Sequence, residues 1–283
     1  MITPDDGVKH FTNPDTHLLS EILYDNFLIN TENFNLLLKL GAIFVNNERQ
    51  VKDKFIPEKS LFRVHLKPRR FNCNFDWKSL IIFENDFFLV LNKPSGIPSQ
   101  PLADNVIENA LTQTSLARGY PLFVTHRLDT LTSGLIVYGK KQSFVTNFNI
   151  QLQNRQIKKN YVALVESINE FPSRLTHYMD PSVGTPKKLS DTAIEGWSVC
   201  ELEIVAQKKL LLKSNLTWLK INLLTGRTHQ IRAQLAFSKA PIQGDTLYGS
   251  TQIFSENAIA LRSCELEFVF NDAPMKFNLD EKF

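Results

Sequence analysis

The sequence predicts an α+β fold built around a mixed, largely antiparallel sheet. Short apolar segments with strand character recur along the chain, helical segments are few and lie between them, and no internal repeat or low-complexity tract is present. With 283 residues, of which 43% are hydrophobic and 22% charged, the chain can bury a sizeable core. This composition indicates a folded globular protein and excludes a disordered one.

The first element is a small N-terminal α+β unit, expected over residues 1–75. The leucine-rich segment 36–40 predicts the end of a helix, and Gly41 suits its C-cap. Residues 42–45 then predict a strand, and residues 61–66 predict another because apolar and polar side chains alternate there. A helix that passes through glycine into such a strand is similar to the S4 RNA-binding fold, although the usual Val-Asn-Gly is Val-Asn-Asn here. The alternative is an unrelated α+β appendage.

A second, larger domain is expected over residues 76–283, after a linker near residues 68–78. Residues 179–213 can be placed only loosely, through the segment KKLS at 187–190. The elements predicted elsewhere are a hairpin at 80–83 and 87–91, strands at 134–138, 161–165 and 219–223, a helix over 144–152, and a short helix near 231–235.

The charge distribution is more informative than the net charge of +3. Residues 48–70 contain eight basic and three acidic side chains, which gives this segment a net charge of +5. Such a run is most often a solvated face, but it ends in Lys-Pro-Arg-Arg, a group that can also follow phosphates. We therefore expect Arg69 and Arg70 to contact nucleic acid.

Cysteine spacing and hydropathy limit the other function classes. Cys73, Cys200 and Cys264 are far apart and lack a histidine at metal-ligand spacing, so we expect reduced thiols and no metal site. No apolar run reaches the roughly 18 residues that span a bilayer, and the first 13 residues lack an apolar signal core. These features predict a cytoplasmic protein that does not contact a membrane.

The densest cluster of reactive side chains is the segment 126–135, HRLDTLTSGL. Arg127 and Asp129 are two residues apart, so an extended chain points both to the same side. An isolated Arg-x-Asp is most often an ion pair that anchors a turn, and the Thr-Ser-Gly that follows is ordinary turn chemistry. By itself this segment leaves the structural and the functional interpretation open.

A second cluster is the segment 226–232, GRTHQIR, followed at 241–249 by PIQGDTLYG. Arg227, His229 and Arg232 fall within one or two helical turns. They can bind phosphate, or one of them can pair with a buried carboxylate. We expect His126 and His229 to be structural histidines, and Asp245 to serve as a turn or helix-cap residue.

Taken together, the segments 126–140 and 225–249 resemble the RluA family of RNA pseudouridine synthases. Three further segments occur in that family's order: FFLVLNKPSGIPSQP at 87–101, KKNYVALV at 158–165 and IALRSCELEF at 259–268. The resemblance covers about residues 80–270 and implies the pseudouridine synthase fold, with helices and loops flanking the sheet. One departure is Leu-Arg-Ser at 261–263, where the family often has Leu-His-Ala.

The resemblance also implies roles for individual residues. Asp129 matches the family's catalytic aspartate, and Arg232 matches the basic residue that pairs with it. Tyr161 matches the tyrosine that packs on the flipped uracil. Arg127 matches the arginine that helps to extrude the target nucleotide. We further expect Arg227 to face RNA.

Lys93 belongs to the Lys-Pro-x-Gly loop that precedes the catalytic motif in this family. A lysine at this position is expected to be structural or to face phosphate rather than to be catalytic. We include it with Arg69, Arg70, Arg127 and Arg227 among the candidate RNA-binding residues.

The implied reaction isomerises uridine to pseudouridine in ribosomal or transfer RNA, without a cofactor or metal. The expected partner is RNA, and the expected state is a monomer. One alternative is a non-catalytic RNA-binding protein with an inactive synthase domain. The other is a nucleoside or glycoside hydrolase, which usually needs two working carboxylates or a metal. The motif core contains one acid, Asp129, which argues against a hydrolase.

Overall fold

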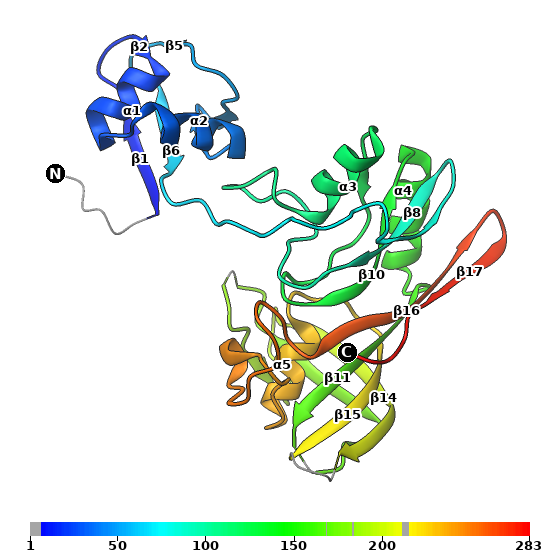
Figure 1. Cartoon of the computed structure of the whole chain (residues 1–283). Coiled ribbons are helices and arrows are strands. Elements are labelled where there is room, and N and C mark those ends of the chain that lie inside the picture. Colours follow the sequence, from blue (N-terminus) through cyan, green and yellow to red (C-terminus); the bar gives the residue numbers. More distant parts are fainter. Residues whose placement is uncertain (1–6, 168, 183, 211–214) are drawn as a thin grey trace.

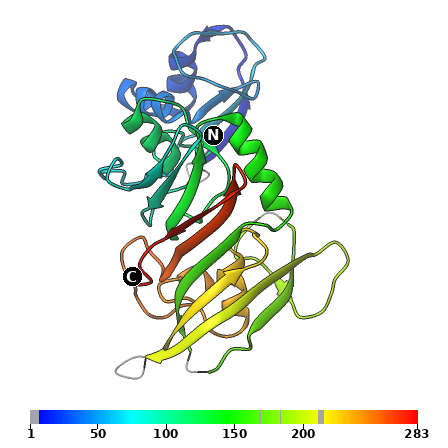
Figure 2. The same ribbon diagram turned by 90° about the vertical axis from the view of Figure 1, so that its right-hand side faces the viewer.

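The computed structural model describes residues 7–167, 169–182, 184–210 and 215–283. An N-terminal unit lies at one end of the molecule, and a larger sheet domain makes up the rest (Figure 1). Figure 2 shows the strands β14 (Ser198–Leu210) and β15 (Leu216–Leu223) at the end opposite that unit. Within the described residues, no helix combines the length and apolarity needed to cross a membrane.

The N-terminal unit is a four-stranded antiparallel sheet with two helices and its own core. At the start of helix α2 (Thr31–Leu40), the Asn30 side chain accepts a hydrogen bond from the Asn33 amide. Gly41 ends this helix with a φ of 69°. Asn46 and Asn47 form the turn between the strands β3 (Ile43–Val45) and β4 (Glu48–Arg49), with positive φ values of 50° and 64°. Asparagine tolerates this left-handed conformation well. The sheet order is β1 (Val8–Thr12), β6 (Leu61–His65), β3, β4; the helices are α1 (Leu19–Phe27) and α2, and β2 (His17–Leu18) pairs with β5 (Phe55–Ile56).

The larger domain contains an eleven-stranded sheet in which one described pair, β10 with β16, is parallel and the others are antiparallel. The predicted mixed, largely antiparallel sheet is therefore confirmed. Its path is β13 (Leu189–Ser190), β12 (Arg174–Met179), β14, β15, β11 (Lys158–Glu166), β16 (Leu261–Phe270), β10 (Ser133–Gly139), β8 (Phe88–Lys93), β7 (Ile81–Glu84), with β17 (Ala273–Asn278) on β16 and β9 (Phe123–Val124) on β10.

Both faces of this sheet are covered, because alternate side chains of a strand point to opposite faces. In β10, Leu135 and Val137 join a core with Phe144 and Phe148 of α4 (Gln142–Gln153). Ile136 and Tyr138 join the other core, which includes Ile231 and Leu235 of α5 (Gln230–Phe237) and Ala110 of α3 (Ala110–Arg118). The apolar run in β10 thus reflects burial on both sides.

The contact between β10 and β16 depends on Gly134. A Cβ at this position would lie 2.1 Å from the Ser263 carbonyl oxygen, and the backbone φ is 109°. Both the close approach and the positive φ require glycine. Gly134 follows directly on the Asp129 loop, so this contact fixes where that loop meets the sheet. The sequence had predicted a turn at Thr-Ser-Gly and a strand over 134–138, but not this close contact.

The predicted hairpin, strands and two helices of the larger domain are present near the expected positions. From the sequence, the stretch 179–213 could be placed only loosely. It contains β13 and β14, and its residues 183 and 211–213 lie outside the described residues. Strand β14 belongs to the sheet through pairs with β12 and β15. Long-range pairing of this kind leaves little signal in a short sequence window.

Candidate active site

Asp129 lies in a loop that leads into β10, and the preceding Lys-Pro-Ser-Gly segment holds this loop in place. The Ser99 hydroxyl donates to the Leu128 carbonyl oxygen at 2.8 Å and accepts from the Leu128 amide at 3.0 Å. The Ser95 hydroxyl donates to the carbonyl oxygen of Leu131. Backbone groups on both sides of Asp129 are therefore fixed by side chains of one neighbouring segment.

Lys93 contributes to the same support and is completely buried. Its ammonium group donates to the carbonyl oxygens of Pro94 at 2.8 Å, Ile97 at 2.7 Å and Thr130 at 3.3 Å. Burial lowers the pKa of Lys93 to about 7, while the negative charge of Asp129 opposes this shift. The expectation that Lys93 contacts RNA is corrected, because its three donors already bind carbonyl groups inside the protein.

Arg232 of α5 joins two carboxylates. Its Nε and Nη2 donate to Asp245 at 2.6 and 2.8 Å, and its Nη1 donates to Asp129 Oδ2 at 3.3 Å. The expected pairing of Arg232 with Asp129 is thus a single hydrogen bond, and the two-pronged contact is made with Asp245, whose side chain is 1% exposed. Asp245 holds the guanidinium so that one remaining nitrogen faces Asp129. Asp245 therefore pairs with Arg232. The sequence had predicted only a turn or helix-cap residue at this position.

Tyr161 of β11 supplies an aromatic wall beside these charged groups. The residue is 6% exposed and lies opposite Ser263 in the pairing of β11 with β16. Burial raises the pKa of its hydroxyl, and the nearby Asp129 raises it further, so the phenol stays protonated at neutral pH. The three predicted residues Asp129, Tyr161 and Arg232 come from a loop, a strand and a helix and line one cavity.

This cavity has a volume of about 470 Å³ and is rich in positive charge. Four cationic side chains and one acidic side chain line it among the described residues: Arg127, Lys159, Arg227 and Arg232, with Asp129. Arg127 and Arg227 are exposed. The Arg127 guanidinium donates to the Thr228 hydroxyl at 2.9 Å, which connects the two motif segments. Such a cavity suits a polyanion that presents one uncharged group to the interior.

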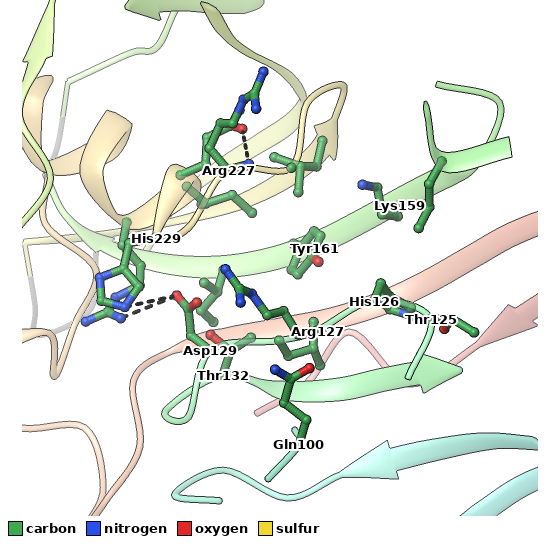
Figure 3. Close-up of a pocket in the computed structure, with 18 of the residues that line it drawn as sticks. Gln100, Thr125, His126, Arg127, Asp129, Thr132, Lys159, Tyr161, Arg227 and His229 are labelled. Atoms are coloured by element: carbon green, nitrogen blue, oxygen red, sulfur yellow. Dashed lines mark hydrogen bonds and ion pairs between the residues drawn. The ribbon is translucent and has the colours of Figure 1, made fainter. Parts of the chain in front are cut away.

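Lys159 was not recognised from sequence. It lies two residues before Tyr161 in the same strand, so both side chains point to the same face, and Figure 3 shows both in the cavity wall. Burial lowers the pKa of Lys159. A Cβ on Gly226 would lie 3.3 Å from the Lys159 ammonium nitrogen, so glycine leaves room for this side chain. The Lys-x-Tyr spacing was the signal that could have identified it.

The two histidines near the cavity differ in their surroundings. His126 Nε2 accepts a hydrogen bond from the Val137 amide at 3.1 Å, and its ring stacks on Phe148. Burial lowers its pKa to about 3, and the charge of Lys159 adds to the effect, so a structural role fits. His229 instead places Nε2 at 3.9 Å from Asp129 Oδ2, inside the site.

The two linker arginines, Arg69 and Arg70, have partners within the protein. Arg69 forms a two-pronged hydrogen bond with Asp104 at 2.9 and 2.7 Å, and Arg70 forms one with Glu108. Arg49 of the N-terminal unit also donates to the carbonyl oxygen of Ala103 at 3.0 Å. These contacts tie the linker and the N-terminal unit to residues 103–108, so we revise the expectation that Arg69 and Arg70 follow phosphates.

A comparison with known families decides the lineage of this chain. The model of the RNA pseudouridylate synthase family matches residues 87–237, which include the Asp129 loop, Tyr161 and Arg232. The chain belongs to this family. Relatives that carry the names of ribosomal large subunit pseudouridine synthases C and D support the RluA-type resemblance.

Several curated proteins named as pseudouridine synthases are similar to this chain over about two thirds of its length or more. An RNA pseudouridine synthase 6, chloroplastic, from Oryza sativa subsp. japonica is 38% identical over 66% of this chain, which spans only 43% of that protein. An uncharacterized RNA pseudouridine synthase of Mycoplasma genitalium is 33% identical over 74% of this chain and 69% of its own length. The ribosomal large subunit pseudouridine synthase C of Buchnera aphidicola is 30% identical over 86% of this chain and 84% of its own length.

A solved structure supports the fold. The human RNA pseudouridylate synthase domain containing 4 matches with a TM-score of 0.57 at 20% sequence identity, over 72% of this chain and 90% of that protein. At this identity the match concerns the fold alone. It confirms the pseudouridine synthase fold predicted for the larger domain.

Proposed function

We propose that this chain isomerises uridine to pseudouridine in RNA, with Asp129 as the catalytic residue. The observation that carries the proposal is the position of the Asp129 carboxylate, which faces Arg232 at 3.3 Å and lies in one cavity with Tyr161. Family membership gives the reaction class, and the cavity gives a location for the chemistry.

The reaction requires that the target uridine leave its stack, which costs a few kcal/mol. Arg127 is exposed at the cavity and carries a charge that can occupy the space left by the base and hold the backbone. Arg227 and Lys159 add positive charge around the cavity, which favours binding of the phosphate backbone. The uracil then enters beside the Tyr161 ring, whose apolar face accepts it in more than one orientation.

Inside the cavity, the C1′–N1 bond breaks, the uracil turns, and a C1′–C5 bond forms. The proton lost from C5 is balanced by one gained at N1, so the product has the same composition as the substrate. Asp129 acts on the sugar, either as the nucleophile at C1′ or as a base. Arg232 holds the carboxylate in position, and Asp245 holds Arg232.

The proposed substrate is structured RNA, with large-subunit ribosomal RNA first and transfer RNA second. The names of relatives support both classes: ribosomal large subunit synthases C and D, and a yeast mitochondrial tRNA pseudouridine(32) synthase that is 30% identical over 62% of this chain. We further propose that residues 1–75 bind RNA as an S4-like domain. The monomeric state and the cytoplasmic location remain predictions.

The test is a pseudouridine assay on RNA from cells that lack this protein, with the wild-type chain and Asp129→Asn. Wild type should form pseudouridine at defined sites. Asp129→Asn should form at least about 1,000-fold less, because the carboxylate is lost, and should bind RNA as well as wild type does. RNA binding without product by the wild type would favour the non-catalytic alternative. Release of free uracil would favour a hydrolase.

A further inference from the structure

We propose that His229 and Tyr248 form a hydrogen-bonded pair that positions Asp129 by directing a neutral imidazole N–H at its carboxylate. The inference rests on the proposed function of Asp129. It assigns a task to two side chains that lie beside the reacting carboxylate and that the proposed chemistry has not yet used.

The backbone places His229 for this task. His229 is the N-cap residue of α5, with φ 57° and ψ 21°, in the left-handed region where histidine is one of the better tolerated residues. Its Nε2 lies 3.9 Å from Asp129 Oδ2, the same oxygen that Arg232 approaches at 3.3 Å. Figure 3 shows His229 next to Asp129, with dashed lines that meet at the carboxylate. Both nitrogens thus face the same carboxylate oxygen, and neither contact involves Oδ1.

The hydrogen-bond partners of Tyr248 determine which imidazole nitrogen carries the proton. The Lys187 backbone amide donates to the Tyr248 hydroxyl at 2.9 Å, and an amide N–H can only donate. The hydroxyl proton is therefore free for His229 Nδ1, which lies 3.2 Å away. Nδ1 then accepts, and the ring proton is on Nε2, facing Asp129. With the opposite tautomer, the Tyr248 hydroxyl proton would have no acceptor among the described residues.

Burial keeps the ring neutral at neutral pH. Burial lowers the pKa of His229; Arg232 and Lys187 lower it further, while Asp129 and Asp245 oppose the shift. An imidazole that is neutral at neutral pH carries one N–H, so its direction matters. The pair therefore depends on the tautomer that Tyr248 sets.

Tyr248 also supports the second donor to Asp129. The Arg232 guanidinium carbon lies 5.1 Å from the centre of the Tyr248 ring, within the range of a cation–π contact. The ring and the hydroxyl thus act on different partners of the same carboxylate. The 3.9 Å between Nε2 and Asp129 Oδ2 is longer than a hydrogen bond, and catalytic contacts of this kind often tighten only when substrate fills the site.

The first test measures the tautomer in the full chain, labelled with ¹⁵N-histidine, by long-range ¹H–¹⁵N NMR at pH 7.5. The expected spectrum shows His229 protonated on Nε2 and unprotonated on Nδ1. Tyr248→Phe, which keeps the ring beside Arg232, should give a mixture of tautomers. A wild-type ring protonated on Nδ1, or on both nitrogens, would overturn the proposal.

The second test compares His229→Asn with His229→Gln in the pseudouridine assay. The asparagine amide reaches only the Nδ1 position and suits the left-handed backbone, whereas the glutamine amide reaches the Nε2 position. His229→Asn should lower kcat about 10- to 100-fold, with KM and Tm close to those of the wild type. The kcat of His229→Gln should be at least about 5-fold higher than that of His229→Asn. Wild-type kcat in His229→Asn, or no recovery with glutamine, would overturn the positioning role. Lack of product with the wild-type chain would overturn the proposed function, while the NMR result would still judge the tautomer.

Discussion

The candidate active-site cavity and the interdomain linker use the same two-pronged arginine–carboxylate contact in different surroundings. Arg232 donates to Asp245 at 2.6 and 2.8 Å, and Arg69 donates to Asp104 at 2.9 and 2.7 Å. The side chains of the first pair are 4% and 1% exposed, and those of the second are 63% and 7% exposed. We therefore expect the loss of one partner to cost more stability in the first pair than in the second, because removing one partner of a buried pair leaves an uncompensated charge.

The two pairs also differ in what they hold. The fork between Arg232 and Asp245 leaves the Arg232 Nη1 for Asp129, so it connects to the proposed catalytic carboxylate. The fork between Arg69 and Asp104 is joined by a bond from the Arg69 backbone amide to the same carboxylate, so it fixes the path of the chain. The comparison predicts that the buried fork affects activity and stability together, whereas the linker forks affect stability alone.

The largest effect is expected from Arg232→Ala. The free energy of unfolding should fall by about 3–5 kcal/mol, because Asp245 is left buried and unpaired. Pseudouridine formation should fall at least about 100-fold, measured under conditions where the variant is folded. Arg232→Lys keeps the charge but loses the planar fork, so it should recover only part of both quantities. Near-normal turnover by the alanine variant would remove Arg232 from the proposed active site.

A smaller effect is expected from the double change of Arg69 and Arg70 to glutamine. Both arginines are more than half exposed, so we expect a loss of about 1–2 kcal/mol in the free energy of unfolding, from chemical denaturation. The salt dependence of RNA binding should stay the same, since both guanidinium groups are already paired with carboxylates. A flatter salt dependence would restore the original prediction that these residues bind RNA.

The acid stability of the linker contact provides a third comparison. Burial by itself would raise the pKa of Asp104, but hydrogen bonds from the Arg69 side chain and amide outweigh burial and lower the pKa to about 2. A carboxyl with a depressed pKa in the folded state stabilises the protein above its unfolded pKa, near 4, and this contribution is lost as the pH falls to about 2. Asp104→Asn should therefore cost about 1 kcal/mol at pH 7, after allowance for solvent screening, and less at pH 3. Equal costs at both pH values would contradict this assignment.

The smallest effect is expected from exposed lysines of the N-terminal unit. Lys52, Lys54 and Lys67 are exposed, and within the described residues none of them forms an ion pair, unlike the linker arginines. Changing all three to glutamine should weaken RNA binding modestly and reduce the slope of log K against log salt by up to about 2–3, since each lost phosphate contact lowers it by nearly one. The fold should be unaffected, as checked by thermal unfolding. An unchanged slope would argue against RNA binding by this unit.

Secondary-structure elements that depend on a few neighbouring residues could be predicted from the sequence alone. The end of α2 at Gly41, the hairpin of β7 and β8, and the helical face of Phe144 and Phe148 follow from periodicity and turn chemistry over a few residues. The motif residues Asp129, Tyr161 and Arg232 were also identified from sequence, through the spacing and order of the family segments. Each of these inferences needs only neighbouring residues or a resemblance carried by short motifs.

The hydrogen-bond partners of the charged side chains became known only from the tertiary structure. The fork of Arg232 is with Asp245, and the acceptors of Lys93 are backbone carbonyls. The linker arginines face carboxylates 35 and 38 residues away. A charged side chain in sequence has a type but no partner, because the partner depends on chain paths that distant strand pairings fix. Burial, which sets the energy of each contact, also arises only when those paths are complete.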